Sequence, residues 1–210
     1  TAVRTSSGAN PEDGVTVLII DARSEGVAIT PLITVAADKQ CEVAFKRVRV
    51  PTENVLGRVG EGWPIVRQML LHGAAATSAS MVGGAQRTLE MAVSYAKERV
   101  QFGKPIGSFQ AIQHKCADML VDVDGARFIM YQAVWKLAEG LDCETDVAMA
   151  KSWVGDAYRR TVAHSNQIHG GIAFSKEFDL GLYFSRARAA EFAYGEGVVQ
   201  REAIARQLLG

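Results

Sequence analysis

The segment RVQFGKPIGSFQ, residues 99–110, joins two long stretches in which apolar residues recur every three or four positions. This spacing predicts helices over about residues 63–100 and 109–140. Three further helices are expected over about residues 144–169, 180–194 and 198–209, and a Gly pair after residue 169 stops the first of these. Long helices with short connections favour an antiparallel bundle.

The same segment concentrates groups that can hold a phosphate. Arg99 offers a planar guanidinium, Gln101 and Gln110 offer amides, and Phe102 and Phe109 are aromatic. An arginine fork binds pyrophosphate oxygens in pairs, so this corner is a candidate anion site.

Two interpretations of this corner are possible. Ser108 is expected to lead the second helix, whose first N–H groups would add a positive dipole end for an anion. Arg99 could instead complement the negative end of its own helix, while the two phenylalanines only fill the corner. The residues alone favour neither interpretation.

A second candidate segment is QIHGG, residues 167–171. Its members are Gln167, Ile168, His169, Gly170 and Gly171. A glycine pair lets a ligand approach bare backbone, and a glutamine can both donate and accept hydrogen bonds. A helix that ends in Gly-Gly more commonly does so only to turn, which is the alternative here.

The first quarter of the chain has a different character. Runs rich in β-branched residues, VTVLIID, VAITPLIT and CEVAFKRVRV, are separated by Gly, Pro and Asp between residues 15 and 50. These runs predict three strands of one sheet fragment that has partners further upstream, preceded by a polar loop. We therefore expect a division into a β-domain fragment, 1–56, and a helical domain, 57–210.

Composition limits the possible functions. The chain has 210 residues, of which 48% are hydrophobic and 22% charged, and 23 basic side chains balance 23 acidic ones. This balance argues against nucleic acid as a partner. No apolar run reaches the roughly 20 residues of a membrane span, and the start does not resemble a signal peptide, so an intracellular protein is expected. Three cysteines and four histidines without ligand spacing predict no metal site.

Three motifs occur here in one order: VRVPTENVLGxxGxGW, RxQFGxPIxxFQ and QxxGG. Together with ADM at residues 117–119 and the closing IARQLLG, this order resembles the acyl-CoA dehydrogenase family. The resemblance implies an α+β, predominantly α fold, in which part of the middle β-domain precedes an antiparallel four-helix-bundle-like C-terminal domain. It also implies a dimer of dimers.

The resemblance implies FAD as the cofactor and assigns two contact segments to the FAD of the neighbouring subunit. The β-domain loop that faces the flavin ring in the family would precede Thr1. We therefore expect this stretch alone to bind FAD poorly. The contact positions carried over are Arg99, Gln101, Phe102, Phe109, Gln110, Gln167, Ile168, His169, Gly170 and Gly171.

The implied reaction removes a proton next to the thioester carbonyl and passes a hydride to the flavin, which gives a trans-2-enoyl-CoA. Such a flavoprotein oxidoreductase belongs to fatty acid β-oxidation. Its electrons would pass to an electron-transferring flavoprotein or a similar acceptor. A bacterial cytoplasm or a mitochondrial matrix would suit it.

The chain departs from the family at the base. Most members carry Tyr-Glu-Gly-Thr, and an ungapped count from Gln167 places its glutamate on Tyr194. Glu196 keeps a Glu-Gly pair with a small shift and is our candidate base. Other members place the base on the first bundle helix, at Gly73 here, with an arginine at what is Ala74. The alternative function is a non-catalytic subunit that supports FAD in a mixed assembly.

Overall fold

The computed structural model describes residues 1–209. The chain forms two compact units, Thr1–Leu71 and the part from His72 onward, and the long helix α1 (Trp63–Glu98) runs through the boundary between them. Each unit is described by itself. The expected division after residue 56 falls between the last strand of the first unit and α1, and it stays a prediction.

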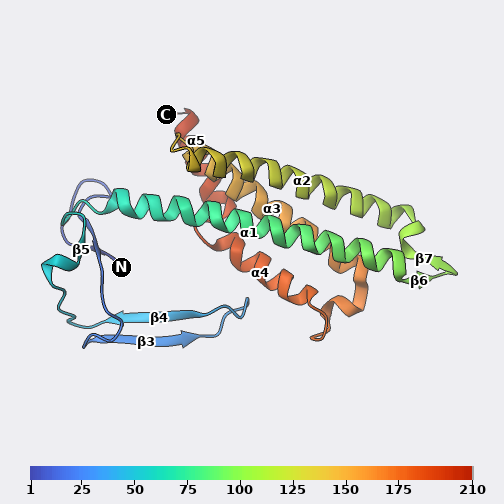
Figure 1. The fold of residues 1–210 in the computed structure, drawn as a ribbon, viewed down its shortest axis with the longest axis horizontal. Helices are drawn as coiled ribbons and strands as arrows, with labels where there is room; N and C mark the ends of the chain where they lie inside the picture. The colour runs from blue at the N-terminus through green and yellow to red at the C-terminus, as the bar shows by residue number, and fades with distance from the viewer. Residues whose placement is uncertain (210) are drawn as a thin grey trace. The chain divides into compact units, whose positions relative to one another are not determined.

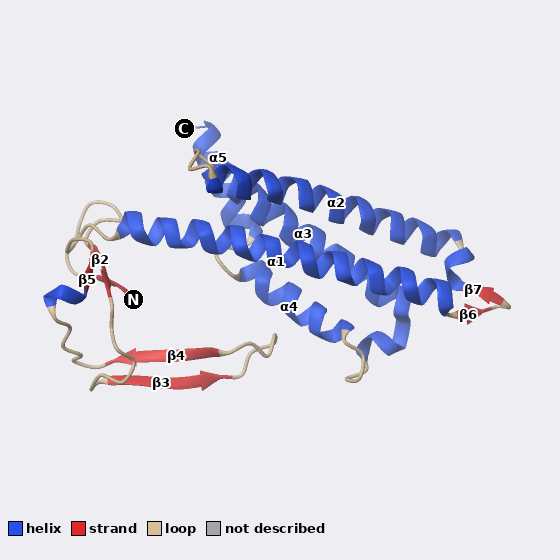
Figure 2. Ribbon diagram, in the orientation of Figure 1, coloured by secondary structure: helices blue, strands red, loops and turns tan. Residues whose placement is uncertain are grey.

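The first unit contains two separate antiparallel sheets. One sheet has the order β1-β2-β5, and the other is the hairpin β3-β4, whose register runs from Val27 opposite Phe45 to Leu32 opposite Gln40 (Figure 2). A short 3-10 helix, Thr52–Asn54, precedes the last strand. The strands are β1 (Ala2–Arg4), β2 (Val15–Leu18), β3 (Val27–Leu32), β4 (Gln40–Phe45) and β5 (Val55–Leu56).

Two expectations for this unit were wrong. The three apolar runs do not form one sheet, because the first run pairs with β1 and β5 rather than with β3. The N-terminal residues are not all loop, since β1 lies antiparallel to β2 with Val3 opposite Thr16. The signal for β1 is short and polar, and only its pairing with a distant segment makes it a strand.

The second unit is a helical bundle, as the sequence predicts. Figure 1 shows α1, α2 and α3 as long rods with the shorter α4 beside them. Helices α2, α4 and α5 all pack on α3, which buries residues along its whole length. Besides α1, the helices are α2 (Gln110–Ala138), α3 (Glu144–His169), α4 (Leu180–Phe192) and α5 (Gly197–Leu209), with 3-10 turns at Ile106–Ser108 and Gly170–Phe174.

Helix α1 meets α3 at two close contacts. The Ser165 hydroxyl of α3 donates to the Thr88 carbonyl of α1 at 3.2 Å, and both residues are buried. Gly84 of α1 faces the buried Tyr158 so closely that a Cβ atom there would lie 2.4 Å from the phenol oxygen. The surrounding core includes Met81, Val82, Ala85, Leu89, Ala92, Ala96, Met119, Val123, Ala126, Met130, Val154, Ala157 and Val162.

A histidine closes the core at one end of the bundle. The ring of His169 stacks on Tyr95 with centroids 4.5 Å apart and contacts Phe178 at 5.0 Å. Its Nδ1 lies 2.8 Å from the Ser165 carbonyl, which makes Nδ1 the donor, and its buried Nε2 has no partner within residues 1–209. Burial lowers the pKa of His169 below its ordinary value, and the bond to Ser165 partly opposes this.

The depressed pKa predicts acid sensitivity. As pH falls below about 6.5, the unfolded chain takes up a proton at His169 while the folded chain does not, so the free energy of unfolding decreases. His169→Phe should keep the ring contacts and remove this contribution. We expect its free energy of unfolding, measured by urea denaturation between pH 7 and 5, to fall less steeply than that of the wild type.

Phe178→Leu is the control, because it weakens the same ring cluster without removing the titrating group. It should lower the free energy of unfolding by about the same amount at each pH. Parallel wild-type and His169→Phe pH profiles would contradict the assignment.

Candidate functional site

The corner between α1 and α2 is a tight hairpin rather than a simple loop. Strand β6 (Val100–Gln101) pairs with β7 (Lys104–Pro105), and the two residues between them both have positive φ, 54° at Phe102 and 79° at Gly103. Such a turn matches the twist of a two-residue hairpin. Phe102 is 93% exposed at its tip, so the ring is presented outward and does not fill the corner.

The start of α2 differs in detail from the expectation. Phe109, not Ser108, is the N-terminal capping position, and its side chain supplies no cap hydrogen bond. The Ser108 hydroxyl donates back to the Pro105 carbonyl at 2.7 Å. Phe109 meets the edge of Phe102, and the Lys104 ammonium lies 4.4 Å from the centre of the Phe109 ring. The first N–H groups of α2 therefore have no side-chain cap.

The polar groups of this corner are exposed. Arg99, Gln101 and Gln110 all lie on the surface. Within the described part of the chain, the guanidinium of Arg99 has no hydrogen-bond or ion-pair partner, whereas Gln101 donates only to the carbonyl beside it at 2.7 Å. A cation without a partner beside uncapped helix N–H groups can accept an anionic ligand.

The second segment lies at the same end of the bundle, and the Tyr95–His169 stack joins the two. Gln167, Gly170 and Gly171 are exposed, whereas Ile168 is buried in the core like His169. Gly170 has φ of 64°, and neither glycine has an atom near the place where a Cβ would stand. The segment therefore offers open backbone to a ligand, while its two buried side chains anchor it.

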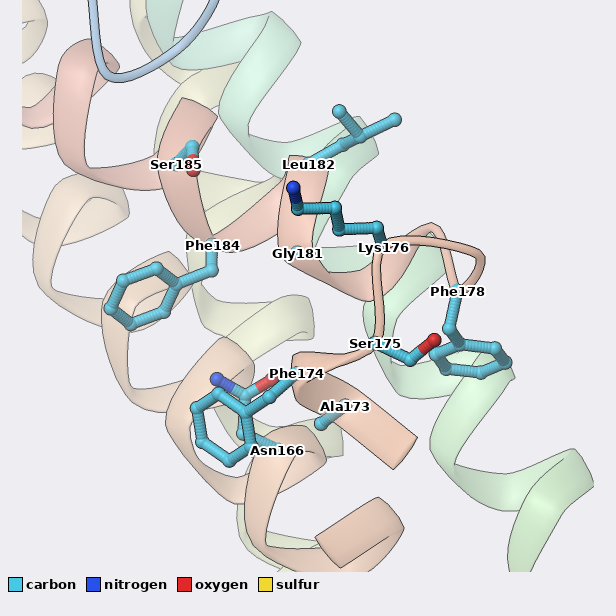
Figure 3. A pocket seen from close by; sticks show the side chains of 10 residues that line it. All are labelled: Asn166, Ala173, Phe174, Ser175, Lys176, Phe178, Gly181, Leu182, Phe184 and Ser185. Carbon is cyan, nitrogen blue, oxygen red and sulfur yellow. The ribbon is translucent and has the colours of Figure 1, made fainter. Parts of the chain in front are cut away.

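A cavity of about 390 Å³ adjoins this second segment. Figure 3 shows its lining, which comes from α3, the following 3-10 turn and α4. Asn166 lines it together with Phe174 and Phe184, and the Oδ1 atom of Asn166 has no hydrogen-bond partner among residues 1–209. A group that carries an N–H or O–H donor would satisfy this oxygen.

A second cavity of about 360 Å³ is lined in part by Tyr95 and His169 themselves. Its lining includes the carboxylates of Glu90, Glu98 and Glu177. Like charges repel a phosphate, so an anionic ligand is better placed on the Arg99 side of the corner.

The turn between α4 and α5 brings together the two positions that concern the base. Tyr194, with φ of 57°, packs against Gly73 of α1: a Cβ built on Gly73 would lie 2.1 Å from the tyrosine ring. The two positions at which family members carry the base, Tyr194 and Gly73 in this chain, therefore lie in contact. Glu196 is half-buried two residues further on, directly before α5.

These two regions are far apart within one subunit. Lys151 of α3 contacts the turn after α4, whereas His169 ends the same helix. At about 1.5 Å per residue, the two side chains are separated by roughly 27 Å along α3. The Arg99 corner and the Tyr194 turn therefore lie toward opposite ends of the bundle.

Several features of the site have no clear signal in the sequence. The sequence places residues 100–105 between two predicted helices but does not show that they form a hairpin, and the unpaired Asn166 oxygen depends on its neighbours in space. The Phe-Gly pair at residues 102–103 could have indicated the turn, because glycine favours positive φ. Lys151 could not have been identified, since lysine is normally exposed.

Comparison with known proteins gives consistent results. A family model described as "Acyl-CoA dehydrogenase, C-terminal domain" matches residues 60–209. The chain is 34% identical to the probable acyl-CoA dehydrogenase YngJ of Bacillus subtilis over 100% of its own length and 57% of that protein. It is 37% identical to the short-chain specific acyl-CoA dehydrogenase of Megasphaera elsdenii over 76% of this chain and 42% of that protein.

Solved structures agree with the sequence relatives. Butyryl-CoA dehydrogenase from Megasphaera elsdenii superimposes with a TM-score of 0.95 at 31% identity, over 100% of this chain and 55% of that one. The structure described as "PigA with FAD and proline" gives a TM-score of 0.88 at 30% identity over 93% and 52%. The chain thus spans about half the length of the relatives that it matches. The match in sequence and fold shows that this chain belongs to the acyl-CoA dehydrogenase family.

Proposed function

We propose that the chain is part of a FAD-dependent enzyme that oxidises an acyl-CoA thioester to the trans-2-enoyl-CoA. The observation that carries this proposal is the Tyr95–His169 stack, which joins the last turn of α1, directly before residues 99–110, to the segment 167–171 at one end of the bundle. Butyryl-CoA dehydrogenase and a protein solved with FAD share this fold.

The residues present fit a dinucleotide. Arg99 is an exposed cation without a partner in the described chain, the two glycines leave open backbone, and Asn166 holds an orphaned acceptor. A pyrophosphate and an adenine need these kinds of group. The exposed or half-exposed residues proposed to hold FAD are Arg99, Gln101, Phe102, Phe109, Gln110, Gln167, Gly170 and Gly171, with Ile168 and His169 as buried anchors.

The separation of the two bundle ends supports an assembly. Segments roughly 27 Å from the Tyr194 turn are better placed to serve the FAD of a neighbouring subunit than to serve the same site. A row of large apolar side chains on the outer face of α2 is also exposed in the single chain, as at an interface. We propose a tetramer, either of identical subunits or with a related one. The exposed row consists of Leu120, Val121, Phe128, Tyr131 and Trp135.

When bound, the flavin supplies the hydride acceptor for the β-carbon. The protein must then supply a carboxylate that takes the proton from the α-carbon. Glu196 is our proposed base. It is half-buried, it follows the turn that touches Gly73, and its carboxylate has no hydrogen-bond or ion-pair partner within residues 1–209.

The other carboxylates of this region are less suitable. Glu191 is held by Arg188 at 2.6 Å and faces Arg159 at 3.7 Å. Glu202 is exposed and lies 3.6 Å from Arg206. A carboxylate held in ion pairs has less tendency to accept a proton.

The contact between Tyr194 and Gly73 favours a second candidate function. Both positions where relatives carry the base lack a carboxylate here, and the tyrosine ring fills the space beside α1. Such a subunit could hold a neighbour's FAD while it catalyses nothing in its own site. In that case the activity would belong to a mixed assembly.

The remaining proposals follow from the same function. We propose an electron-transferring flavoprotein or a similar acceptor as the electron partner, and fatty acid β-oxidation as the metabolic setting. A bacterial cytoplasm or a mitochondrial matrix would suit this chemistry. Among residues 1–209, no helix has both the length and the apolar character to cross a bilayer.

The base assignment predicts the behaviour of Glu196→Gln. In the flavin-loaded protein, substrate addition should bleach the flavin absorbance, and the substitution should slow bleaching about 10²- to 10⁴-fold, the usual contribution of a general base. Stopped-flow absorbance with a series of acyl-CoAs measures this rate. Glu202→Gln, an exposed carboxylate on α5, is the matched control, and unchanged bleaching in Glu196→Gln would reject the assignment.

The cofactor assignment predicts the behaviour of Arg99→Gln. Loss of a charge-assisted hydrogen bond to a phosphate costs about 1.5–3 kcal/mol, which corresponds to roughly 10- to 150-fold weaker FAD binding. Flavin fluorescence titration of the apoprotein measures the affinity. Arg206→Gln on α5 is the control, since that arginine is exposed and pairs with Glu202 away from the corner; equal affinities for both variants would contradict the site.

The two candidate functions predict different purification behaviour. A catalytic homotetramer should carry flavin and bleach with a suitable acyl-CoA when it is purified alone. A supporting subunit should purify without flavin and gain it only after co-expression with a second, related polypeptide. Flavin-to-protein ratios from absorbance and masses from light scattering distinguish these outcomes.

A further inference from the structure

We propose that Lys151 is a positioning residue that holds Tyr194 against Gly73 and so fixes the tyrosine as one wall of the acyl site. The proposal rests on the proposed function only in taking the Tyr194 turn, between α4 and α5, as part of the acyl site. The contacts themselves stand without it. Three observations carry it: a buried ammonium, a strained turn and a glycine that leaves room for a ring.

The first observation is the burial of Lys151. Only 1% of this residue is exposed, in the first half of the central helix α3. Its Nζ donates to the Glu191 carbonyl at 3.0 Å and to the Gly195 carbonyl at 3.2 Å. A buried cation is costly unless it is hydrogen-bonded. Both of these acceptors belong to the end of α4 and the following turn, so the cost is offset only while the turn keeps this shape.

The second observation is the conformation of the turn. Helix α4 ends at Phe192, and Tyr194 and Gly195 follow with φ of 57° and 93°. The left-handed region is unfavourable for a residue with a side chain, so external contacts must hold Tyr194 there. Lys151 holds one side, and the Gln200 amide of α5 donates to the Tyr194 carbonyl at 2.8 Å on the other.

The third observation is the space at Gly73. The Tyr194 ring lies so close to the α1 backbone that any side chain at position 73 would collide with it. About half of the tyrosine surface, 49%, stays exposed. The ring is therefore packed against α1 on one side and open on the other, as a wall residue must be.

These contacts link the buried Lys151 to the ring of Tyr194 in sequence. The buried ammonium fixes the carbonyls on both sides of Tyr194, the fixed turn directs the ring to α1, and Gly73 receives it. Lys151 touches neither substrate nor cofactor in this arrangement. Its role is to set where the phenol stands, and with it the room for an acyl group beside α1.

The test uses the purified full-length protein labelled with 3-fluorotyrosine and observed by ¹⁹F NMR. The Tyr194 resonance is assigned by its loss in Tyr194→Phe. In Lys151→Met this resonance should move by more than its linewidth toward the position of free 3-fluorotyrosine, whereas the resonance of Tyr131, on the outer face of α2, stays in place. Lys151→Gln, which keeps one donor group, should give a smaller displacement and serves if the methionine variant does not fold.

Lys136→Met is the matched control. It removes a half-buried lysine of α2 that pairs at 2.6 Å with Asp146, a residue of α3 like Lys151. The substitution therefore lowers stability without touching the turn. The Tyr194 resonance should not move in this variant. In Gly73→Ala, by contrast, the ring should be displaced although Lys151 is intact, and the resonance should move.

An unmoved Tyr194 resonance in a folded Lys151 variant overturns the proposal, as does a displacement of equal size in Lys136→Met. Flavin bleaching is recorded on the same samples. If the wild type bleaches but the resonance does not respond to Lys151 substitution, the inference fails while the proposed function stands. If the resonance responds but no acyl-CoA bleaches the flavin, the positioning contacts stand and the proposed activity fails.

Discussion

Packing of α2, α4 and α5 on the central helix α3 is the constraint on which the helical unit depends, and α1 meets the same helix at two close contacts. Gly84 faces Tyr158, and the Ser165 hydroxyl reaches the Thr88 backbone of the facing helix. A larger residue at Gly84 would collide with the phenol of the buried Tyr158, and the packing around that ring would have to shift. Because a close-packed protein interior transmits strain, the packed helices act as a rigid frame.

The rigid frame determines where chemistry can be placed. One end carries the hairpin after α1 and the glycine pair after α3, locked together by the Tyr95–His169 stack. Toward the other end, Tyr194 meets Gly73. Roughly 27 Å of helix separates Lys151 from His169, so the two candidate regions of one chain lie far from each other. This separation is the physical reason for our proposal that groups from another subunit complete each region.

The three long helices could be predicted from the sequence because each buries residues at three- and four-residue spacing, and α3 begins and ends at the residues expected. Features that depend on residues far away in the sequence could not be predicted in this way. Strand β1 exists through its pairing with β2, and Phe102 points outward because the connection between α1 and α2 folds as a hairpin. Among the cofactor candidates, Arg99 is exposed as a ligand contact requires, whereas His169 is buried, which residue type alone does not reveal. The roles of both stay predictions.

The chemistry of the turn limits where a base can stand. Tyr194 carries no carboxylate, so it does not supply the base that the family resemblance assigns to a glutamate at this position. Lys151 and Gln200 hold the carbonyls of Gly195 and Tyr194, and the backbone before Glu196 is therefore fixed. Glu196 can approach a substrate only through its own side-chain torsions. A glutamine there keeps the shape and torsions while it loses the charge, so Glu196→Gln reports on the carboxylate rather than on a rearranged turn.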